Sequence, residues 1–382
     1  MRRPLPDTIA MGYADWGECD AKIMTAAANG VNVIVWFALS MTLDASGVPH
    51  IGGGPNLTCV AKTAADLNSQ GLPTHHLISI GGWNGAHPDP AASADAWWGA
   101  LSAYDTAAEA AGLPGGFDGI DWDIEGNDSP SSTSNHFPPE ELRLLARISE
   151  LAKANGKLVA MVPAQSYLDA STSEFALDVL RAPHCGWHDE FKYHGRNAYA
   201  AVLALAKPDT FDLVSLQLYE SWSQANCMLS SPAHGGQGVG LAAYLDGLVR
   251  AMETGWRVDF GLEPALGLPN QTVNVPASRL LLGLGNGWTG QGGCVDEPCK
   301  ALWVEPEALK TAWAALGSRR ARGLFFWDIG DEGLASGVAA EPIYLARTFN
   351  EVLGTRGTRG EGAAAGGGAK NEMVELQNQI VS

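Results

Sequence analysis

Basic residues are scarce in this chain of 382 residues. Lys and Arg together number 24 against 42 Asp and Glu, so the formal net charge at pH 7 is −18. A surface this acidic is repelled by phosphate backbones and by anionic lipid headgroups. We therefore expect neither nucleic acid nor a membrane surface as a partner.

Long apolar runs are also lacking. No stretch reaches the roughly 20 residues that a membrane-spanning helix needs, and the start, Met1-Arg2-Arg3-Pro4, shows no apolar segment of signal-peptide type. The six cysteines are even in number, as three disulfides would require. Disulfides favour an extracellular protein whose signal sequence is not in this chain, and a cytoplasmic enzyme with free thiols is the alternative.

Short apolar and β-branched runs recur along the chain, and near-continuous apolar character is typical of parallel strands buried on both faces. The eight runs are residues 8–12, 31–39, 76–81, 117–125, 157–163, 211–219, 279–285 and 323–327. Amphipathic helical patterns lie between them, and the three with the clearest ends cover residues 139–156, 241–255 and 306–317. Eight strands separated mostly by helices predict an α/β protein with a single (β/α)8 barrel rather than a doubly wound sheet.

One catalytic domain, residues 1–354, accounts for this alternation, and we expect no second domain. Residues 355–382 are predicted to be a flexible tail, because positions 355–370 hold six Gly and four Ala. Such a composition cannot bury enough apolar surface to form a packed unit.

The fourth run, Phe117-Asp118-Gly119-Ile120-Asp121-Trp122-Asp123-Ile124-Glu125, holds an unusual concentration of acids. Side chains alternate across a strand, so Asp121, Asp123 and Glu125 share one face and Trp122 faces the helices. Glu125 falls at the carboxyl end of the strand, where barrel enzymes place catalytic residues. The alternative without a catalytic role is an exposed edge strand with solvated acids, but this pattern arises by chance only about once in 10⁵ positions.

The pattern Asp118-x-x-Asp121-x-Asp123-x-Glu125 resembles the signature of family 18 glycoside hydrolases, which include chitinases and endo-β-N-acetylglucosaminidases. Ser79-Ile80-Gly81-Gly82 is similar to that family's motif on the third strand. Gln217-Leu218-Tyr219 on the sixth strand looks most like plant class III chitinases. The resemblance runs from Ile9 to about Leu353 and has further counterparts at Tyr13, Phe37, Met161, Gln165 and Trp327.

The resemblance implies retaining, endo-type cleavage of β-1,4-N-acetylglucosamine linkages in chitin or chito-oligosaccharides, with the substrate's own acetamido group as nucleophile. Glu125 would be the general acid and base. Asp123 would orient the acetamido N–H, and Asp121 would share a proton with Asp123. Tyr219 would hold the acetamido carbonyl. This chemistry needs no metal or other cofactor, and we expect a monomer.

The remaining counterparts divide into two groups. The residues expected to contact substrate are Trp327, Tyr13, Phe37, Gln165, Met161 and Gln217, with Trp327 under the sugar ring. The residues expected to support the site are Asp118, Ser79, Gly81 and Gly82. One departure is Glu220, where relatives usually carry Asp or Asn.

Features known in relatives give further expectations. Non-proline cis peptides are expected at Trp36–Phe37 and Trp327–Asp328. A disulfide between Cys185 and Cys227 would match one in plant class III enzymes. The spacing of Cys294 and Cys299 allows a local bridge, and Cys19 and Cys59 remain as a third pair.

Three alternatives stay open. An endo-β-N-acetylglucosaminidase acting on N-glycans would share both the barrel and Glu125. A chitinase-like lectin would share the barrel, but such proteins typically lack the terminal glutamate. A metal-dependent hydrolase would use the cluster His184, Cys185, His188, Asp189 and His194, whose spacing fits no standard structural zinc site.

Four tryptophans that follow candidate strands could stack on sugars or be partly buried, namely Trp16, Trp83, Trp222 and Trp288.

Overall fold

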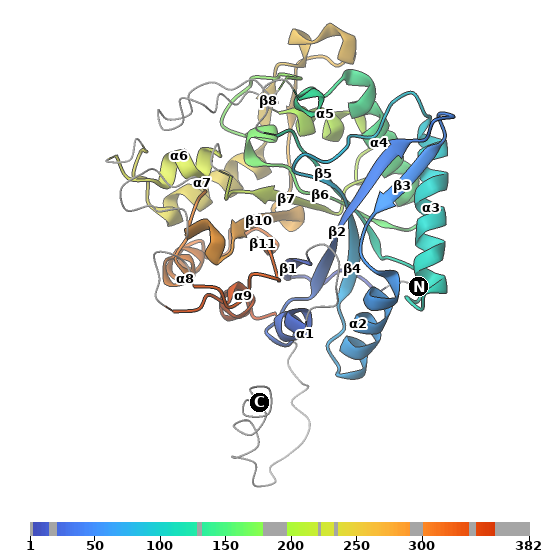
Figure 1. Ribbon diagram of the computed structural model, residues 1–382. Coiled ribbons are helices and arrows are strands. Elements are labelled where there is room, and N and C mark those ends of the chain that lie inside the picture. The colour runs from blue at the N-terminus through green and yellow to red at the C-terminus, as the bar shows by residue number, and fades with distance from the viewer. Residues whose placement is uncertain are drawn as a thin grey trace.

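Eight parallel strands close into a barrel in the computed structural model, which describes residues 3–14, 21–127, 132–178, 197–220, 223–232, 236–290, 301–335 and 341–355 (Figure 1). The strands are β1 (Ile9–Ala14), β2 (Val33–Leu43), β4 (His75–Gly82), β5 (Gly119–Ile124), β6 (Leu158–Met161), β7 (Leu213–Gln217), β10 (Leu280–Gly285) and β11 (Gly323–Trp327). Each pairs in parallel with the next, and β1 pairs with both β2 and β11, which closes the ring. The predicted (β/α)8 barrel is confirmed.

Helices surround the barrel in Figure 1. They are α1 (Ala21–Ala28), α2 (Leu57–Ser69), α3 (Ala94–Ala110), α4 (Pro139–Ala154), α5 (Ala198–Leu205), α6 (Gln224–Leu229), α7 (Leu241–Thr254), α8 (Pro306–Ala315) and α9 (Leu345–Leu353). The three helices predicted with clear ends are α4, α7 and α8. Helix α4 begins at Pro139, where the fixed φ suits a first helical residue and the missing N–H costs nothing.

Two additions to the barrel were not anticipated from the sequence. Strand β2 continues past the barrel and pairs antiparallel with β3 (Pro49–Gly53). The Asp44 side chain fixes the connecting turn, because its Oδ1 accepts hydrogen bonds from the backbone N–H of Ser46 and of Val48. Between α7 and β10, β8 (Trp256–Val258) and β9 (Gln271–Val273) form a separate two-stranded sheet.

Side-chain alternation along the strands divides the core into two layers. The inner layer fills the barrel with residues such as Met11, Val35 and Phe325, and the outer layer lies between barrel and helices. Trp122 and Trp313 are fully buried in the outer layer. The barrel interior is therefore packed, and its carboxyl end holds the buried acids Asp121, Asp123 and Glu125.

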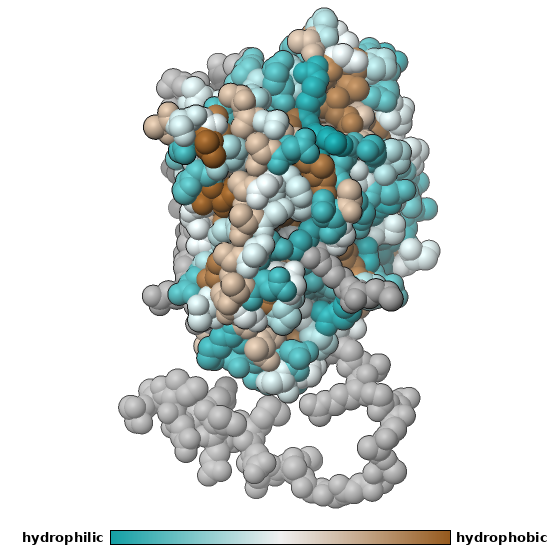
Figure 2. Space-filling model, turned by 90° about the vertical axis from the view of Figure 1, so that its right-hand side faces the viewer, coloured by the Kyte–Doolittle hydropathy of each residue, from teal (hydrophilic) through white to brown (hydrophobic). Residues whose placement is uncertain are grey.

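Figure 2 turns the side of α2, α3 and β3 toward the viewer, and there hydrophilic residues are interspersed with small hydrophobic patches. Among the helices that the structure describes, none combines the length and the apolar character needed to cross a bilayer.

Two of the six cysteines belong to the described residues. Cys59 at the start of α2 and Cys227 in α6 are both disulfide-bonded. Cys19, Cys185, Cys294 and Cys299 lie outside the described residues, so the three pairings stay predictions. The predicted tail also lies outside them, except for Thr355.

Candidate active site

Strand β5 carries three carboxyls to the mouth of the barrel. Asp121 and Asp123 lie on its inward face, and Glu125 follows its last residue. The register pairs Ser79 of β4 with Asp121 and Gly81 with Asp123. Asp121 is 0% exposed, and Asp123 and Glu125 are each 6% exposed. Carboxyls this buried need hydrogen-bond partners or protons, because desolvation penalises their charged form.

Asp121, the deepest of the three, is held by two hydroxyls. Its Oδ2 accepts hydrogen bonds from the Tyr13 hydroxyl at 2.8 Å and from Ser79 Oγ at 3.1 Å. Burial raises the pKa of Asp121 to about 7, against the opposing effect of these two donors. Asp121 is thus poised between its neutral and charged forms near neutral pH.

Asp123 and Glu125 are hydrogen-bonded to each other through their carboxyls. Gln217 Nε2 donates to both, at 3.0 Å from Asp123 Oδ1 and 2.6 Å from Glu125 Oε1. Burial raises the pKa of Glu125, although the hydrogen bonds from Asp123 and Gln217 oppose the rise. Burial, followed by the neighbouring charge of Glu125, raises the pKa of Asp123 well above its ordinary value. The pair therefore binds a proton that solvated carboxyls would release.

This arrangement corrects one expectation. The sequence suggested that Asp121 and Asp123 share a proton, but the shared hydrogen bond joins Asp123 and Glu125. Asp121 Oδ2 is already occupied by Tyr13 and Ser79, and its Oδ1 has no hydrogen-bond partner among the described residues.

Aromatic rings surround the acids. The Trp327 ring centroid lies 5.8 Å from that of Tyr13 and 4.7 Å from that of Phe37, whose ring stands nearly perpendicular to it. Trp288 Nε1 donates to the Trp327 carbonyl at 3.0 Å, and its ring meets Tyr219 edge-on at 6.0 Å. Trp327 and Trp288 are only partly buried, so both present ring surface at the mouth of the barrel.

The backbone at two of these aromatics has cis peptide bonds. Trp327–Asp328 is cis, as expected. The bond in β2 is Phe37–Ala38 rather than Trp36–Phe37, so that prediction is wrong by one residue. Trp36 faces the outer layer, where its Nε1 contacts His76, and the β2–β4 register becomes irregular only between Trp36 and Leu39.

Gly81 and Gly82 are required by close contacts. Both have positive φ, +107° and +95°. A Cβ on Gly81 would lie 2.3 Å from the Asp123 carbonyl oxygen, and one on Gly82 would lie 2.2 Å from the Phe37 ring. A side chain at either position would displace the strand or the ring that forms the site.

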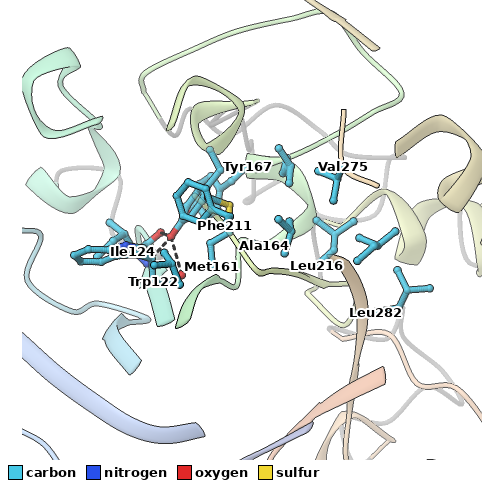
Figure 3. Close-up of a cluster of buried hydrophobic side chains, with 14 of the residues drawn as sticks. Trp122, Ile124, Met161, Ala164, Tyr167, Phe211, Leu216, Val275 and Leu282 are labelled. Atoms are coloured by element: carbon cyan, nitrogen blue, oxygen red, sulfur yellow. Dashed lines mark hydrogen bonds between the residues drawn. The ribbon is translucent and has the colours of Figure 1, made fainter. Parts of the chain in front are cut away.

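Met161 and Gln165 do not lie where substrate contact requires. Met161 pairs in register with Trp122, so both side chains point into the outer layer, and Figure 3 draws them in one buried hydrophobic cluster with Tyr167. Gln165 is 1% exposed; its Nε2 donates to the Tyr244 hydroxyl and its Oε1 accepts from the backbone N–H of Ala225. We therefore correct both assignments to packing and loop support.

Asp118 lies at the opposite end of β5 from Glu125. It accepts a hydrogen bond from the backbone N–H of His76 at 2.8 Å and lies 3.5 Å from His75 Nδ1. Burial favours its neutral form, but these partners outweigh burial and hold the pKa of Asp118 below its ordinary value. Asp118 thus ties β5 to β4, which matches a supporting role.

Several residues that hold the backbone around Glu125 in place were not predicted from the sequence. The Tyr199 hydroxyl accepts from the Ile124 N–H at 2.6 Å, and the Tyr167 hydroxyl accepts from the Gly126 N–H at 2.9 Å. Asn135 Oδ1 accepts from the Asn127 N–H at 2.7 Å. Tyr167 and Tyr199 come from segments 41 and 75 residues away from their partners, and Asn135 from a short turn after β5, so no shared motif could have indicated them.

The other candidates fall at the rim or outside the described residues. Trp83 follows β4 and is 53% exposed. Glu220 is partly buried, and its charge contributes to the raised pKa values of Asp123 and Tyr219. The described residues contain no group of His, Cys, Asp and Glu arranged to hold a metal ion. Trp16, Trp222 and the His184 cluster lie outside the described residues.

Comparison with known proteins shows the fold. The sequence matches no family model and no curated protein. The C-terminal domain of Legionella pneumophila ChiA is similar in structure, with a TM-score of 0.52, 15% identity, and coverage of 91% of this chain and 96% of that one. A family 18 chitinase from Pseudoalteromonas aurantia has a TM-score of 0.52 and 10% identity, covering 91% of this chain and 100% of that one. The family 18 resemblance read from the motifs is thereby confirmed at the level of the fold.

Proposed function

We propose that this protein is a retaining glycoside hydrolase that cleaves β-1,4 linkages of N-acetylglucosamine in chitin or chito-oligosaccharides. The observation that carries the proposal is the hydrogen-bonded pair of Asp123 and Glu125 at the mouth of a barrel, with Gln217 donating to both. The shared fold with family 18 chitinases supports it.

The first step needs a proton donor. Glu125, protonated because burial raises its pKa, gives its proton to the glycosidic oxygen as the bond from C1 to that oxygen breaks. The carbonyl oxygen of the 2-acetamido group forms a bond to C1 and yields an oxazolinium ion. In the second step, Glu125 takes a proton from water as the water oxygen attacks C1. The oxazolinium ring opens, and the sugar product has the original anomeric configuration.

The placement of Asp123 favours this route over a carboxylate nucleophile. An acid and a nucleophilic carboxylate flank the sugar with about 5–5.5 Å between them. Asp123 and Glu125 instead touch each other, so no sugar carbon can sit between them. Asp123 is better placed to turn from Glu125 to the acetamido N–H and to stabilise the positive charge that develops there.

The aromatic rings supply the binding surface. Trp327 stacks under the sugar at the cleavage point, against Tyr13 and Phe37. Tyr219 orients the acetamido carbonyl. Trp83, exposed just after β4, offers a further ring for a sugar of a linear chain.

We further propose that the protein acts as a monomer, since one chain supplies every residue of this site, and outside the cell, since Cys59 and Cys227 are disulfide-bonded.

The alternative substrate is the chitobiose core of N-glycans, which presents the same acetamido group. The test incubates the protein with chitin oligosaccharides and, separately, with a high-mannose glycopeptide, and identifies products by mass spectrometry. Shortened chitin oligomers support the proposal, and cleavage of the glycopeptide alone selects the alternative. If neither substrate is cut while chitin oligomers still bind, the protein is a lectin.

A further inference from the structure

The backbone around Glu125 lies beyond the reach of neighbouring strands. Strand β5 pairs with β6 only as far as Trp122 and with β4 only as far as Ile124. Buried backbone groups that lose strand partners need side-chain partners. Tyr199, Tyr167 and Asn135 provide three such partners, and all three are neutral. The partner of the Glu125 carbonyl itself is an ionisable residue.

That partner is His87, from the loop after β4. Its Nε2 lies 2.9 Å from the Glu125 carbonyl oxygen, and its Nδ1 lies 2.9 Å from Glu141 Oε1 on α4. The side chains of His87 and Glu141 are 10% and 3% exposed, and the His87 ring packs against Phe137 at 4.9 Å. The imidazole thus bridges the backbone of Glu125, through a hydrogen-bond contact, and the buried carboxyl of Glu141, through an ion-pair contact.

Hydrogen-bond chemistry fixes the protons of this bridge. A carbonyl oxygen can only accept, so Nε2 must carry a hydrogen. Nδ1 and Glu141 share one further proton, either as imidazolium and carboxylate or as neutral imidazole and carboxylic acid. In both forms the hydrogen on Nε2 remains and the bond to Glu125 is kept.

Loss of the shared proton changes the bridge. A neutral imidazole has one N–H for two acceptors, and the charged carboxylate of Glu141 attracts it more strongly than the neutral carbonyl. The hydrogen then moves to Nδ1, which leaves the lone pair of Nε2 facing the lone pairs of the Glu125 carbonyl. The contact changes from attraction to repulsion.

We propose that His87, oriented by Glu141, is a positioning residue for Glu125 that holds the catalytic backbone while the pair keeps its shared proton and releases it when that proton is lost. This inference rests on the proposed function, because it concerns the acid of that reaction. It gives the site a second source of pH dependence besides the carboxyls that contact substrate.

The surrounding charges determine the pH at which the bridge between His87 and Glu125 is lost. Burial alone would lower the pKa of His87, but the hydrogen bond and charge of Glu141 and the Glu125 carbonyl outweigh burial, so the pKa is raised. Burial also raises the pKa of Glu141, against the effects of His87 and of His136, which is itself paired with Asp178. The bridge is therefore intact below the raised pKa of His87 and is lost as the pH rises through it.

Two variants separate positioning from general stability. His87→Leu removes the donor at every pH. Glu141→Gln is nearly isosteric and removes the carboxylate, so neutral His87 keeps its hydrogen on Nε2 and accepts from the new amide at Nδ1. His50→Leu, on exposed β3, is the control for replacing a histidine.

The first readout needs no substrate. The Gly126 amide shares a peptide unit with the Glu125 carbonyl, so its ¹H–¹⁵N chemical shift reports the hydrogen bond to His87. We expect the wild-type and His50→Leu signals to move with pH above the ordinary range of histidine. In Glu141→Gln and in His87→Leu this His87-dependent movement should be absent, leaving only the titration of the neighbouring carboxyls, and the signal should be shifted at every pH in His87→Leu. A Gly126 signal that titrates alike in wild type and Glu141→Gln overturns the inference.

The second readout is hydrolysis of a chitin oligosaccharide. We expect His87→Leu to lower kcat about 10–100-fold, with KM within about twofold, because a misplaced catalytic group costs turnover more than binding. Glu141→Gln should keep most of the kcat. An unchanged kcat in His87→Leu overturns the positioning role. If the wild type hydrolyses neither test substrate, the proposed function fails, and the Gly126 signal still decides whether the bridge exists.

Discussion

Gln217 Nε2 lies within hydrogen-bond distance of both Asp123 Oδ1 and Glu125 Oε1, at 3.0 and 2.6 Å. The amide also contacts the Val162 carbonyl at 2.7 Å, so three acceptors compete for its two hydrogens. A neutral donor between two acids stabilises negative charge without supplying a full positive charge. Gln217 therefore helps to set how readily Glu125 gives up its proton.

Replacing Gln217 tests this role. Gln217→Leu removes a hydrogen bond that lowers the pKa of Glu125, so that pKa should rise further. Glu125 must be protonated to start the reaction, and the alkaline limb of the kcat/KM profile should move to higher pH. Gln165→Leu, a buried glutamine without contact to the acids, is the matched control and should leave the limb in place. An unshifted limb in Gln217→Leu would contradict this role.

Glu125, the proposed general acid, has the largest expected effect. Glu125→Gln should keep the fold and the melting temperature within a few degrees, since Gln preserves the volume and the hydrogen bonding. Turnover of chitin oligosaccharides should fall by about 10²–10⁴-fold, because the proton donor is lost. Initial rates together with circular dichroism check both parts. Near-normal turnover would refute the assignment.

Asp123→Asn probes the proposed role of Asp123 in orienting the acetamido nucleophile. The variant keeps a polar side chain beside Glu125 but cannot carry the negative charge that stabilises the oxazolinium ion. We expect kcat to fall by about 10²-fold, with little change in oligosaccharide affinity measured by calorimetry. An effect on KM alone would indicate that Asp123 only binds substrate.

Cellulose oligomers provide a test on the substrate side. They have the same β-1,4 linkage and ring size, but a hydroxyl replaces the acetamido group. Because that group is the proposed nucleophile, we expect chitin oligomers to be cut and cellulose oligomers of equal length to stay intact under the same conditions. Efficient release of glucose or cellobiose would rule out the acetamido mechanism.

Gly82 connects stability with the shape of the site. Gly82→Ala would push a methyl group into the Phe37 ring from a backbone with φ of +95°, so it should destabilise the fold by about 1–3 kcal/mol and lower activity. Gly99→Ala is the matched control. Gly99 is exposed in α3 with no atom near its added Cβ, and alanine should stabilise that helix by about 1 kcal/mol. Thermal unfolding of both variants measures the contrast, and equal effects would contradict the close-contact argument.

The alternation of side chains along a strand accounts for what could be predicted of the site from the sequence. The run that became β5 alternates apolar residues with acids, so the inward direction of Asp121, Asp123 and Glu125 followed from counting residues. Met161 shows where residue matching without parity goes wrong. Its register with Trp122 sends it outward, and the pairing of β5 with β6 is not visible in either segment alone.

The residues that support the acids from behind could not be predicted from the sequence for a different reason. Tyr199 and His87 contact the backbone of Ile124 and Glu125, and Glu141 acts through His87. Backbone groups leave no trace in residue identity. A buried His and a buried Glu separated by more than 50 positions look like ordinary loop and helix residues until the fold brings them together. The cis bond in β2 was misplaced by one position for a similar reason, since the register change there depends on β4.

Closure of the barrel between β1 and β11 has a consequence for biosynthesis. Tyr13 comes from the first strand and Trp327 from the last, and the two rings meet directly beside the acids. A nascent chain on the ribosome holds the complete acidic motif long before its last strand has been made. The mouth of the barrel stays unfinished until β1 and β11 meet, so the proposed hydrolytic activity should appear only in chains whose synthesis has passed β11.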